Sequence, residues 1–158
     1  MNNFKNLSKG NAVWIFQANP EKYDIFKALK DESIGSIIHW SVKQYANEIQ
    51  KGDIALIWLS GKKAGIYFIA EIISMPIMLI EPESERKYWF DKTDKPEEEL
   101  CVKLNIFQDL SENPVLRENI KNIERTKNLS IIRQPRGTNF KVTFEEWEEL
   151  EALLKFKF

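Results

Sequence analysis

Two neighbouring apolar segments constrain the fold of this chain more than any other feature. Residues 53–60 read DIALIWLS, residues 65–75 read GIYFIAEIISM, and a glycine-bounded turn, GKKAG, joins them. Runs of β-branched and aromatic residues on both sides of such a turn predict a β-hairpin. Neither run alternates polar with apolar residues, so both faces of the hairpin are expected to be buried. A small sheet buries both faces when it curls into a barrel and helices cover its outside.

The rest of the chain predicts an α+β domain with a small β-barrel of about five to six strands and short flanking helices. Residues 1–11 are expected to be a flexible lead-in, and residues 12–158 a single domain. Asn19 and Pro20 are expected to cap and begin the first helix, and Thr143 and Glu146 form a capping box that begins the last one. An acidic stretch, residues 81–99, is predicted to be an exposed excursion. Further strands are predicted at 12–17, 36–42 and 99–107, helices at 20–31, 44–50, 111–122 and 143–155, and an extended segment at 129–142.

Composition excludes several classes of function. The chain has one cysteine, Cys101, and one histidine, His39, so a disulfide or a multi-ligand metal site is not expected. Its glycines form no phosphate-binding loop, and no residue pattern marks a catalytic nucleophile. We therefore expect no enzyme activity and no cofactor. The polar start of the chain and the lack of a long apolar run predict a cytoplasmic protein without a membrane segment.

Tryptophans near the predicted strands are the most informative residues for function. A flat heterocycle stacks on an indole ring, and two or three such walls would form a cage for a modified base. Polar side chains at strand ends could then bind the edge of the base. A tryptophan in a small barrel is also a common core residue, and Trp58 and Trp147 are the most core-like. The base-binding candidates are Trp14, Trp40, Trp58 and Trp89, with Asn19, Ser41 and the adjoining Val42.

Basic residues are concentrated in one part of a chain whose net charge is only −1. Between Val115 and Lys141 there are seven Lys or Arg and two Asp or Glu residues, a local charge of +5. Such a stretch could hold phosphates, although a stretch of this charge is usually a solvated face. The phosphate-binding candidates are Arg133, Arg136, Thr138, Lys43, Lys62 and Lys63.

The order of several segments resembles an EVE domain of the PUA-like superfamily. These segments are VWIFQANPEKYD, IIHWSVKQYANEIQKGDIALIWLSGKKAGIYFIAEI, and RQPRGTNFKVT before EEWEEL, which together span about residues 12–152. The related YTH domains read methylated adenine in RNA, and their cage pattern matches Asn19, Trp40-Ser41, Trp89 and Arg136 here. Gln17 stands where those domains carry a lysine. The resemblance implies binding of a modified base, and a separate restriction or defence protein as a possible effector.

These observations together predict a non-catalytic module that flips a modified, methylated base of DNA or RNA into an aromatic cage. Trp40 would stack on the base, with Trp89 or Trp14 as the opposing wall. Two alternatives stay open. The cage could hold a free modified nucleoside or another flat ligand, or the domain could be a protein-interaction module without a ligand pocket.

Overall fold

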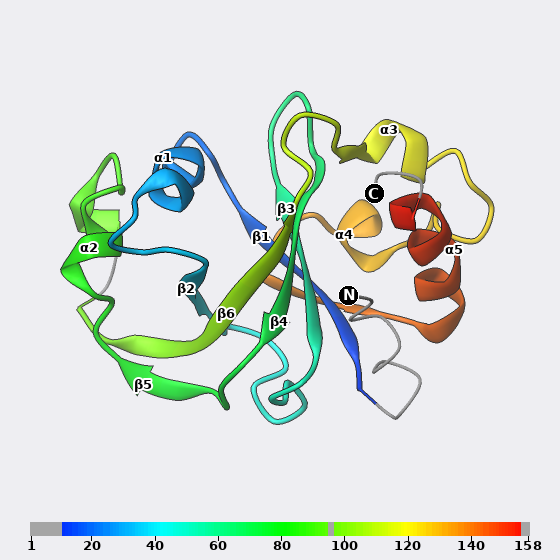
Figure 1. Ribbon diagram of the computed structural model, residues 1–158. Coiled ribbons are helices and arrows are strands. Elements are labelled where there is room, and N and C mark those ends of the chain that lie inside the picture. The colour runs from blue at the N-terminus through cyan, green and yellow to red at the C-terminus, as the bar shows by residue number, and fades with distance from the viewer. Residues whose placement is uncertain (1–10, 95–96, 156–158) are drawn as a thin grey trace.

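A computed structural model describes residues 11–94 and 97–155 of the chain. Its strands form one mixed sheet that curls into a half-barrel (Figure 1). Along the sheet the order is β2-β6-β4-β3-β1-β8, while β5 pairs with β6 and β7 pairs with β4. The strands are β1 (Val13–Ala18), β2 (Ile37–Ser41), β3 (Ile54–Leu59), β4 (Gly65–Ile72), β5 (Ile77–Leu79), β6 (Glu99–Asp109), β7 (Val115–Leu116) and β8 (Asn139–Val142).

Short helices lie on both sides of the curled sheet (Figure 1). The longest of them, α5, closes the outer face together with α3 and α4, and α1 and α2 lie on the opposite side. The α+β prediction is therefore confirmed. The helices are α1 (Ile25–Lys30), α2 (Glu83–Arg86), α3 (Arg117–Ile120), α4 (Ser130–Arg133) and α5 (Phe144–Lys155), with a 3₁₀ turn, η2 (Lys92–Asp94).

Every residue of β3 is buried, as the apolar pattern of the hairpin predicts. Its side chains alternate between two clusters, because successive residues of a strand point to opposite faces. Leu56 and Trp58 pack in the outer cluster with residues of α5 such as Trp147. Ala55 and Ile57 pack in the inner cluster with residues of β2 and α1. The strand thus has no face toward water.

The two edge strands of the half-barrel, β2 and β8, are connected by side-chain amides. Asn139 on β8 is 2% exposed. Its Nδ2 donates to the Ser41 carbonyl over 3.1 Å, and its Oδ1 accepts from the backbone amides of Lys43 and Gln44. The Oε1 of Gln44 accepts in return from the backbone amides of Thr138 and Asn139. These bonds fix the end of β2 and its last residue, Ser41, against the end of β8.

Local sequence signals correctly predict where the last helix, α5, begins. The capping box forms as predicted: the Thr143 amide donates to Glu146 Oε1, and the Glu146 amide donates to Thr143 Oγ1. The Asn19 cap is wrong. The first helix begins only at Ile25, where the Asp24 side chain accepts from the Lys27 amide.

Two other helix predictions are also wrong, and the extended segment is wrong in part. Residues 44–50 form turns, since Tyr45 adopts a φ of 61° that no α-helix contains. Only 117–120 of the predicted 111–122 helix is helical, and β7 takes the two residues before it. The extended segment 129–142 contains α4. The lead-in 1–11 lies outside the described residues, apart from Asn11. None of the described helices is long and apolar enough to span a membrane.

Candidate functional site

A pocket of about 160 Å³ opens where the ends of β1 and β2 meet the segment 81–89. Its walls come from four parts of the chain: residues 17–23, residues 38–43, the pair Glu81 and Trp89, and Thr138. Aromatic, aliphatic, polar and charged side chains all contribute to its lining. The lining residues are Gln17, Ala18, Asn19, Lys22, Tyr23, Ile38, His39, Trp40, Ser41, Lys43, Glu81, Trp89 and Thr138.

Two tryptophans that are far apart in sequence both line this pocket. Trp40 lies on β2 and is 8% exposed, so most of its ring packs in the inner cluster. Trp89 forms an isolated β-bridge with Tyr23, and their rings meet edge to face with centroids 5.0 Å apart. The Trp89 indole Nε1 donates to Glu81 Oε2 over 3.0 Å. These contacts hold the Trp89 side chain in a defined orientation beside the pocket.

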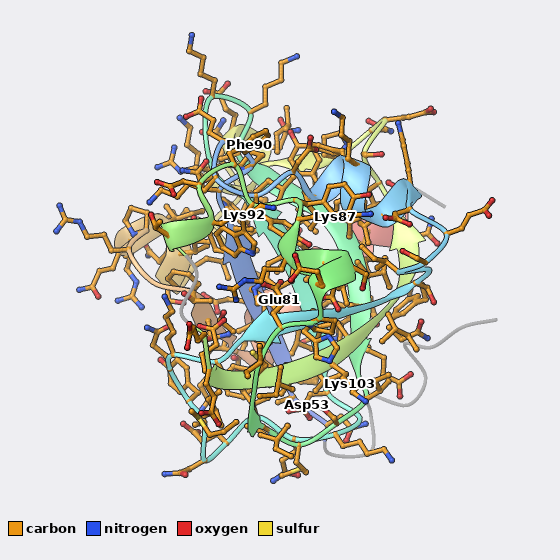
Figure 2. The ribbon with its side chains drawn as sticks, turned by 90° about the vertical axis from the view of Figure 1, so that its left-hand side faces the viewer. Asp53, Glu81, Lys87, Phe90, Lys92 and Lys103 are labelled. Carbon is orange, nitrogen blue, oxygen red and sulfur yellow. The ribbon has the colours of Figure 1, made fainter. Side chains whose placement is uncertain are left out.

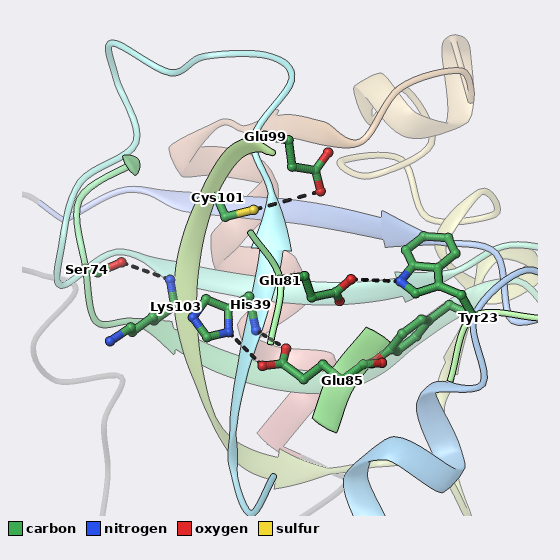
Figure 3. Close-up of polar contacts among 9 residues, drawn as sticks. Tyr23, His39, Ser74, Glu81, Glu85, Glu99, Cys101 and Lys103 are labelled. Atoms are coloured by element: carbon green, nitrogen blue, oxygen red, sulfur yellow. Dashed lines mark hydrogen bonds and ion pairs between the residues drawn. The ribbon is translucent and has the colours of Figure 1, made fainter. Parts of the chain in front are cut away.

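A buried glutamate, Glu85, forms hydrogen bonds with two residues that line the pocket, His39 and Tyr23 (Figure 3). Glu85 is 3% exposed. Its carboxylate accepts from the His39 amide over 2.7 Å and lies 2.7 Å from His39 Nδ1. Its backbone carbonyl accepts from the Tyr23 hydroxyl over 3.0 Å. Burial, followed by the charges of Glu81 and Glu85, raises the pKa of Tyr23 far above its usual value, so Tyr23 stays a neutral phenol.

The prediction of an exposed excursion at 81–99 holds for residues 90–93, 97 and 98 and is wrong for the first half of the segment. Glu81 and Glu85 are both buried. Figure 2 shows Glu81 near the centre of one face of the molecule, with Lys87, Phe90 and Lys92 above it. The segment begins and ends in contact with the sheet and forms one wall of the pocket. The Glu81 and Glu85 carboxylates can be buried because Trp89 and His39 donate hydrogen bonds to them.

Ser41 ends β2 with its side chain already in a hydrogen bond. Its Oγ donates to Glu99 Oε1 over 2.5 Å. The hydroxyl proton is used in this bond, so the oxygen lone pairs of Ser41 would have to accept from a ligand. Asn19 is held by a turn, in which its Oδ1 accepts from the Glu21 amide over 2.9 Å. Gln17 donates through Nε2 to the carbonyls of Pro135 and Gly137.

The structure brings six of the predicted site residues together and separates the others. Trp14 and Trp58 are core residues, 1% and 2% exposed, and neither lines the pocket. The Trp14 indole is directed to Asp53 instead. Val42 is likewise buried. The predicted residues that do line the pocket are Asn19, Trp40, Ser41, Lys43, Trp89 and Thr138.

Sequence reasoning missed Lys22, Tyr23, His39 and Glu81 as pocket residues. Lys22 and Tyr23 fall inside what reads as a helix, and Glu81 falls inside what reads as a solvated acidic run. The only available signal was the position of His39, one residue before Trp40 on β2. Successive residues of a strand point to opposite faces, so the position of His39 next to Trp40 predicted that these two side chains would not share a site.

Four of the seven basic residues in the predicted stretch form ion pairs with described residues of the chain. Lys141 pairs with Glu48, Arg125 with Glu148, and Lys121 and Lys127 with acidic neighbours three residues away. Arg133 and Arg136 are exposed, form no ion pair with the described residues, and do not line the pocket. Lys62 and Lys63 line a neighbouring groove of about 520 Å³, to which Asn19 also contributes.

The segment that carries Trp89 is attached to the end of α1 through Asp31. The Asp31 carboxylate accepts from the Tyr88 hydroxyl over 2.6 Å and pairs with Lys87 at 3.2 Å. Hydrogen bonds from Tyr88 and then Ser33 hold the pKa of Asp31 well below its usual range.

This lowered pKa predicts a specific acid sensitivity. Ionised Asp31 stabilises the fold above the usual carboxyl pKa of about 3.9, and this contribution is lost as pH falls toward the lower native value. We expect Asp31→Asn to flatten the dependence of unfolding free energy on pH between about pH 5 and pH 2. Urea unfolding across this range measures it. Glu32→Gln, an exposed neighbour, is the control, and an Asp31→Asn curve parallel to wild type would contradict the prediction.

A family model described as the EVE domain matches residues 12–153. The chain belongs to the EVE domain family. This agrees with the resemblance found in the sequence. No curated protein matches the chain.

Solved structures share the fold at low sequence identity. A hypothetical protein from Leishmania major is 17% identical, with a TM-score of 0.66 over 94% of this chain and 98% of that one. A Pseudomonas syringae protein is 21% identical, with a TM-score of 0.62 over 90% and 99%. Human THYN1, in complex with DNA containing 5-methylcytosine, is 14% identical, with a TM-score of 0.64 over 90% and 97%. These likenesses confirm the predicted PUA-like α+β fold of the EVE domain.

Proposed function

We propose that this EVE domain binds nucleic acid that carries a modified base, and that the pocket between Trp40 and Trp89 receives the base. The observation that carries the proposal is the pair of tryptophans: both line one small opening, together with polar side chains such as those of Asn19 and Ser41. The complex of THYN1 with DNA containing 5-methylcytosine supports the same ligand class. Stacking on an aromatic side chain contributes about 1–3 kcal/mol per base.

The size of the pocket favours one base over a larger ligand. Pockets for drug-sized ligands measure about 300–1,000 Å³, whereas this one has a volume of about 160 Å³. A single flat ring system fits that scale, and a base must leave its stack to enter. The flipping step costs a few kcal/mol in a duplex, so a single strand is expected to bind more tightly. Asn19 and Ser41 would contact the base edge.

Lysines at the rim would hold the phosphates beside the flipped base. Lys22 and Lys43 line the pocket, are exposed, and form no ion pair with any residue in the described ranges. Lys62 and Lys63 lie along the adjoining groove, in the direction that a neighbouring nucleotide would take. Thr138 is at the rim, and Arg133 and Arg136 precede it in the chain, so longer strands could reach both arginines.

The small-molecule alternative differs from this proposal in its response to salt. Each phosphate contact adds about 0.7–0.9 to the slope of log affinity against log salt, and a neutral nucleoside adds none. The alternative without a ligand pocket is disfavoured by the open pocket beside Trp40 and two exposed lysines.

The test is a titration of intrinsic tryptophan fluorescence with short single strands at two salt concentrations. One strand carries 5-methylcytosine, one N6-methyladenine, and one no modification. We expect salt-sensitive quenching that depends on the modification. Lys22→Gln and Lys43→Gln are each expected to lower the salt slope by about one contact, and Lys30→Gln, an exposed lysine of α1 away from the pocket, is the control. Equal binding of all three strands would show that the domain does not recognise a modification. Affinity that does not change with salt concentration would show that it does not contact phosphates.

A further inference from the structure

One acidic side chain in the pocket has no part in the stacking argument. Glu81 lines the pocket and is 6% exposed, which is unusual for a carboxylate. Its Oε2 accepts from the Trp89 indole N–H over 3.0 Å, and Figure 3 shows the Glu81 carboxylate directed at the indole nitrogen. The carboxylate thus sits beside the aromatic wall against which a base would stack.

The chemistry of a carboxylate restricts which base edge can face it. An ionised carboxylate only accepts hydrogen bonds, and its two oxygens have about four lone-pair sites. It can therefore hold the Trp89 indole and accept from a ligand at the same time. A glutamate accepts from the exocyclic amino group of cytosine, whereas the oxygen that replaces this group in thymine or uracil is an acceptor. Two acceptors that face each other in a buried site repel each other, and the oxygen of the base loses its water without gaining a donor.

We infer that Glu81 determines the specificity of the pocket: it accepts a hydrogen bond from the exocyclic amino group of the flipped base. The ligand class is an amino-bearing base, such as cytosine, adenine or their methylated forms, in preference to thymine or uracil. This inference rests on the proposed function. It adds a rule that the tryptophans alone cannot supply, because every base has a face that can stack.

The link to Trp89 couples recognition to stacking. The hydrogen bond between Glu81 and Trp89 orients the ring and the carboxylate as one unit, and Tyr23 meets the ring edge to face. A base with an amino group would then meet the acceptor and the ring at the same time. A base with an oxo group would bring its own acceptor against the Glu81 carboxylate and leave that oxygen without a donor.

The sharpest comparison is between 5-methylcytosine and thymine at one position of an otherwise identical single strand. Both bases carry the same 5-methyl group. They differ at position 4, where an amino group is replaced by oxygen, and at N3, which accepts in 5-methylcytosine and carries a hydrogen in thymine. We expect wild-type protein to prefer 5-methylcytosine by roughly tenfold or more. Adenine and hypoxanthine form a second matched pair, with the same expected direction. Affinity is measured by fluorescence titration of the full chain.

Glu81→Gln tests whether this residue sets the preference. Glutamine keeps the size of the side chain and an oxygen for the Trp89 indole, and its amide can donate to the thymine oxygen. The preference is expected to fall to within about threefold, mainly through tighter binding of thymine. Glu83→Gln, an exposed change on α2, should leave the preference as in wild type. Urea unfolding midpoints show whether each variant is folded.

The outcomes separate this inference from the proposed function. If wild-type protein binds both pyrimidines equally and the bound base still quenches tryptophan fluorescence, the role of Glu81 is wrong and the proposed function stands. A preference that survives Glu81→Gln in a folded variant does the same. Wild-type protein that binds no oligonucleotide overturns the proposed function, and the inference fails with it.

Discussion

Replacing Asp53 by alanine is expected to destabilise the fold by about 3–5 kcal/mol. Asp53 is 3% exposed and lies at the start of β3 (Figure 2). Its carboxylate accepts three hydrogen bonds: from the Ala12 amide at 3.0 Å, from the Trp14 indole at 2.8 Å, and from the Gln50 amide at 2.9 Å. A hydrogen bond to a charged group contributes about 1.5–3 kcal/mol, and a buried donor left without its acceptor costs about 1–3 kcal/mol.

Urea unfolding measures this loss as a lower midpoint with an unchanged slope. Asp53→Asn keeps the size and one acceptor oxygen, so its loss should be about half that of the alanine variant. Trp14→Phe removes a single donor and the indole ring, and separates the contribution of that bond from those of the two backbone amides. An alanine variant that loses less than about 1 kcal/mol would show that these hydrogen bonds do not determine the stability of the β1–β3 region.

Replacing Trp40 by alanine is expected to weaken binding of the modified strand by about 1–3 kcal/mol, which is roughly fivefold to a hundredfold and more. The same change removes a ring that packs in the inner cluster and is 8% exposed. A fully buried tryptophan changed to alanine costs about 3–5 kcal/mol of stability. Binding must therefore be compared under conditions in which the variant is folded.

A pair of phenylalanine variants separates binding from stability. Trp40→Phe keeps an aromatic ring of smaller area, so it should retain part of the stacking energy and most of the fold. Trp58→Phe makes the same change in the outer cluster, away from the pocket, and should lower stability without changing affinity. If folded Trp40→Ala protein binds the modified strand with unchanged affinity, Trp40 is not part of the binding site.

The sequence by itself determined the features that depend on short-range patterns. The buried β3–β4 hairpin followed from two apolar runs around a turn, and the capping box at Thr143 followed from four residues. The choice of Trp40 and Ser41 as pocket residues followed from their position at the end of a strand and from the family resemblance. These predictions depend on contacts within a few residues, or on a pattern of apolar residues that indicates which face of an element is buried.

Tertiary structure alone decided which tryptophans line the pocket and what faces them. Trp14 stands in an apolar run and Trp89 in a charged stretch, and tertiary contacts place each ring: Asp53 holds the indole of Trp14 within the core, and Glu81 holds that of Trp89 at the pocket. Burial of Glu81 depends on Trp89, and the orientation of Trp89 depends on Tyr23, 66 positions earlier in the chain. Hydrogen bonds between distant residues produce no periodic pattern in the sequence, because each of them pairs one buried polar group with one partner. The pocket is therefore a product of the fold, although its first aromatic wall is visible in the sequence.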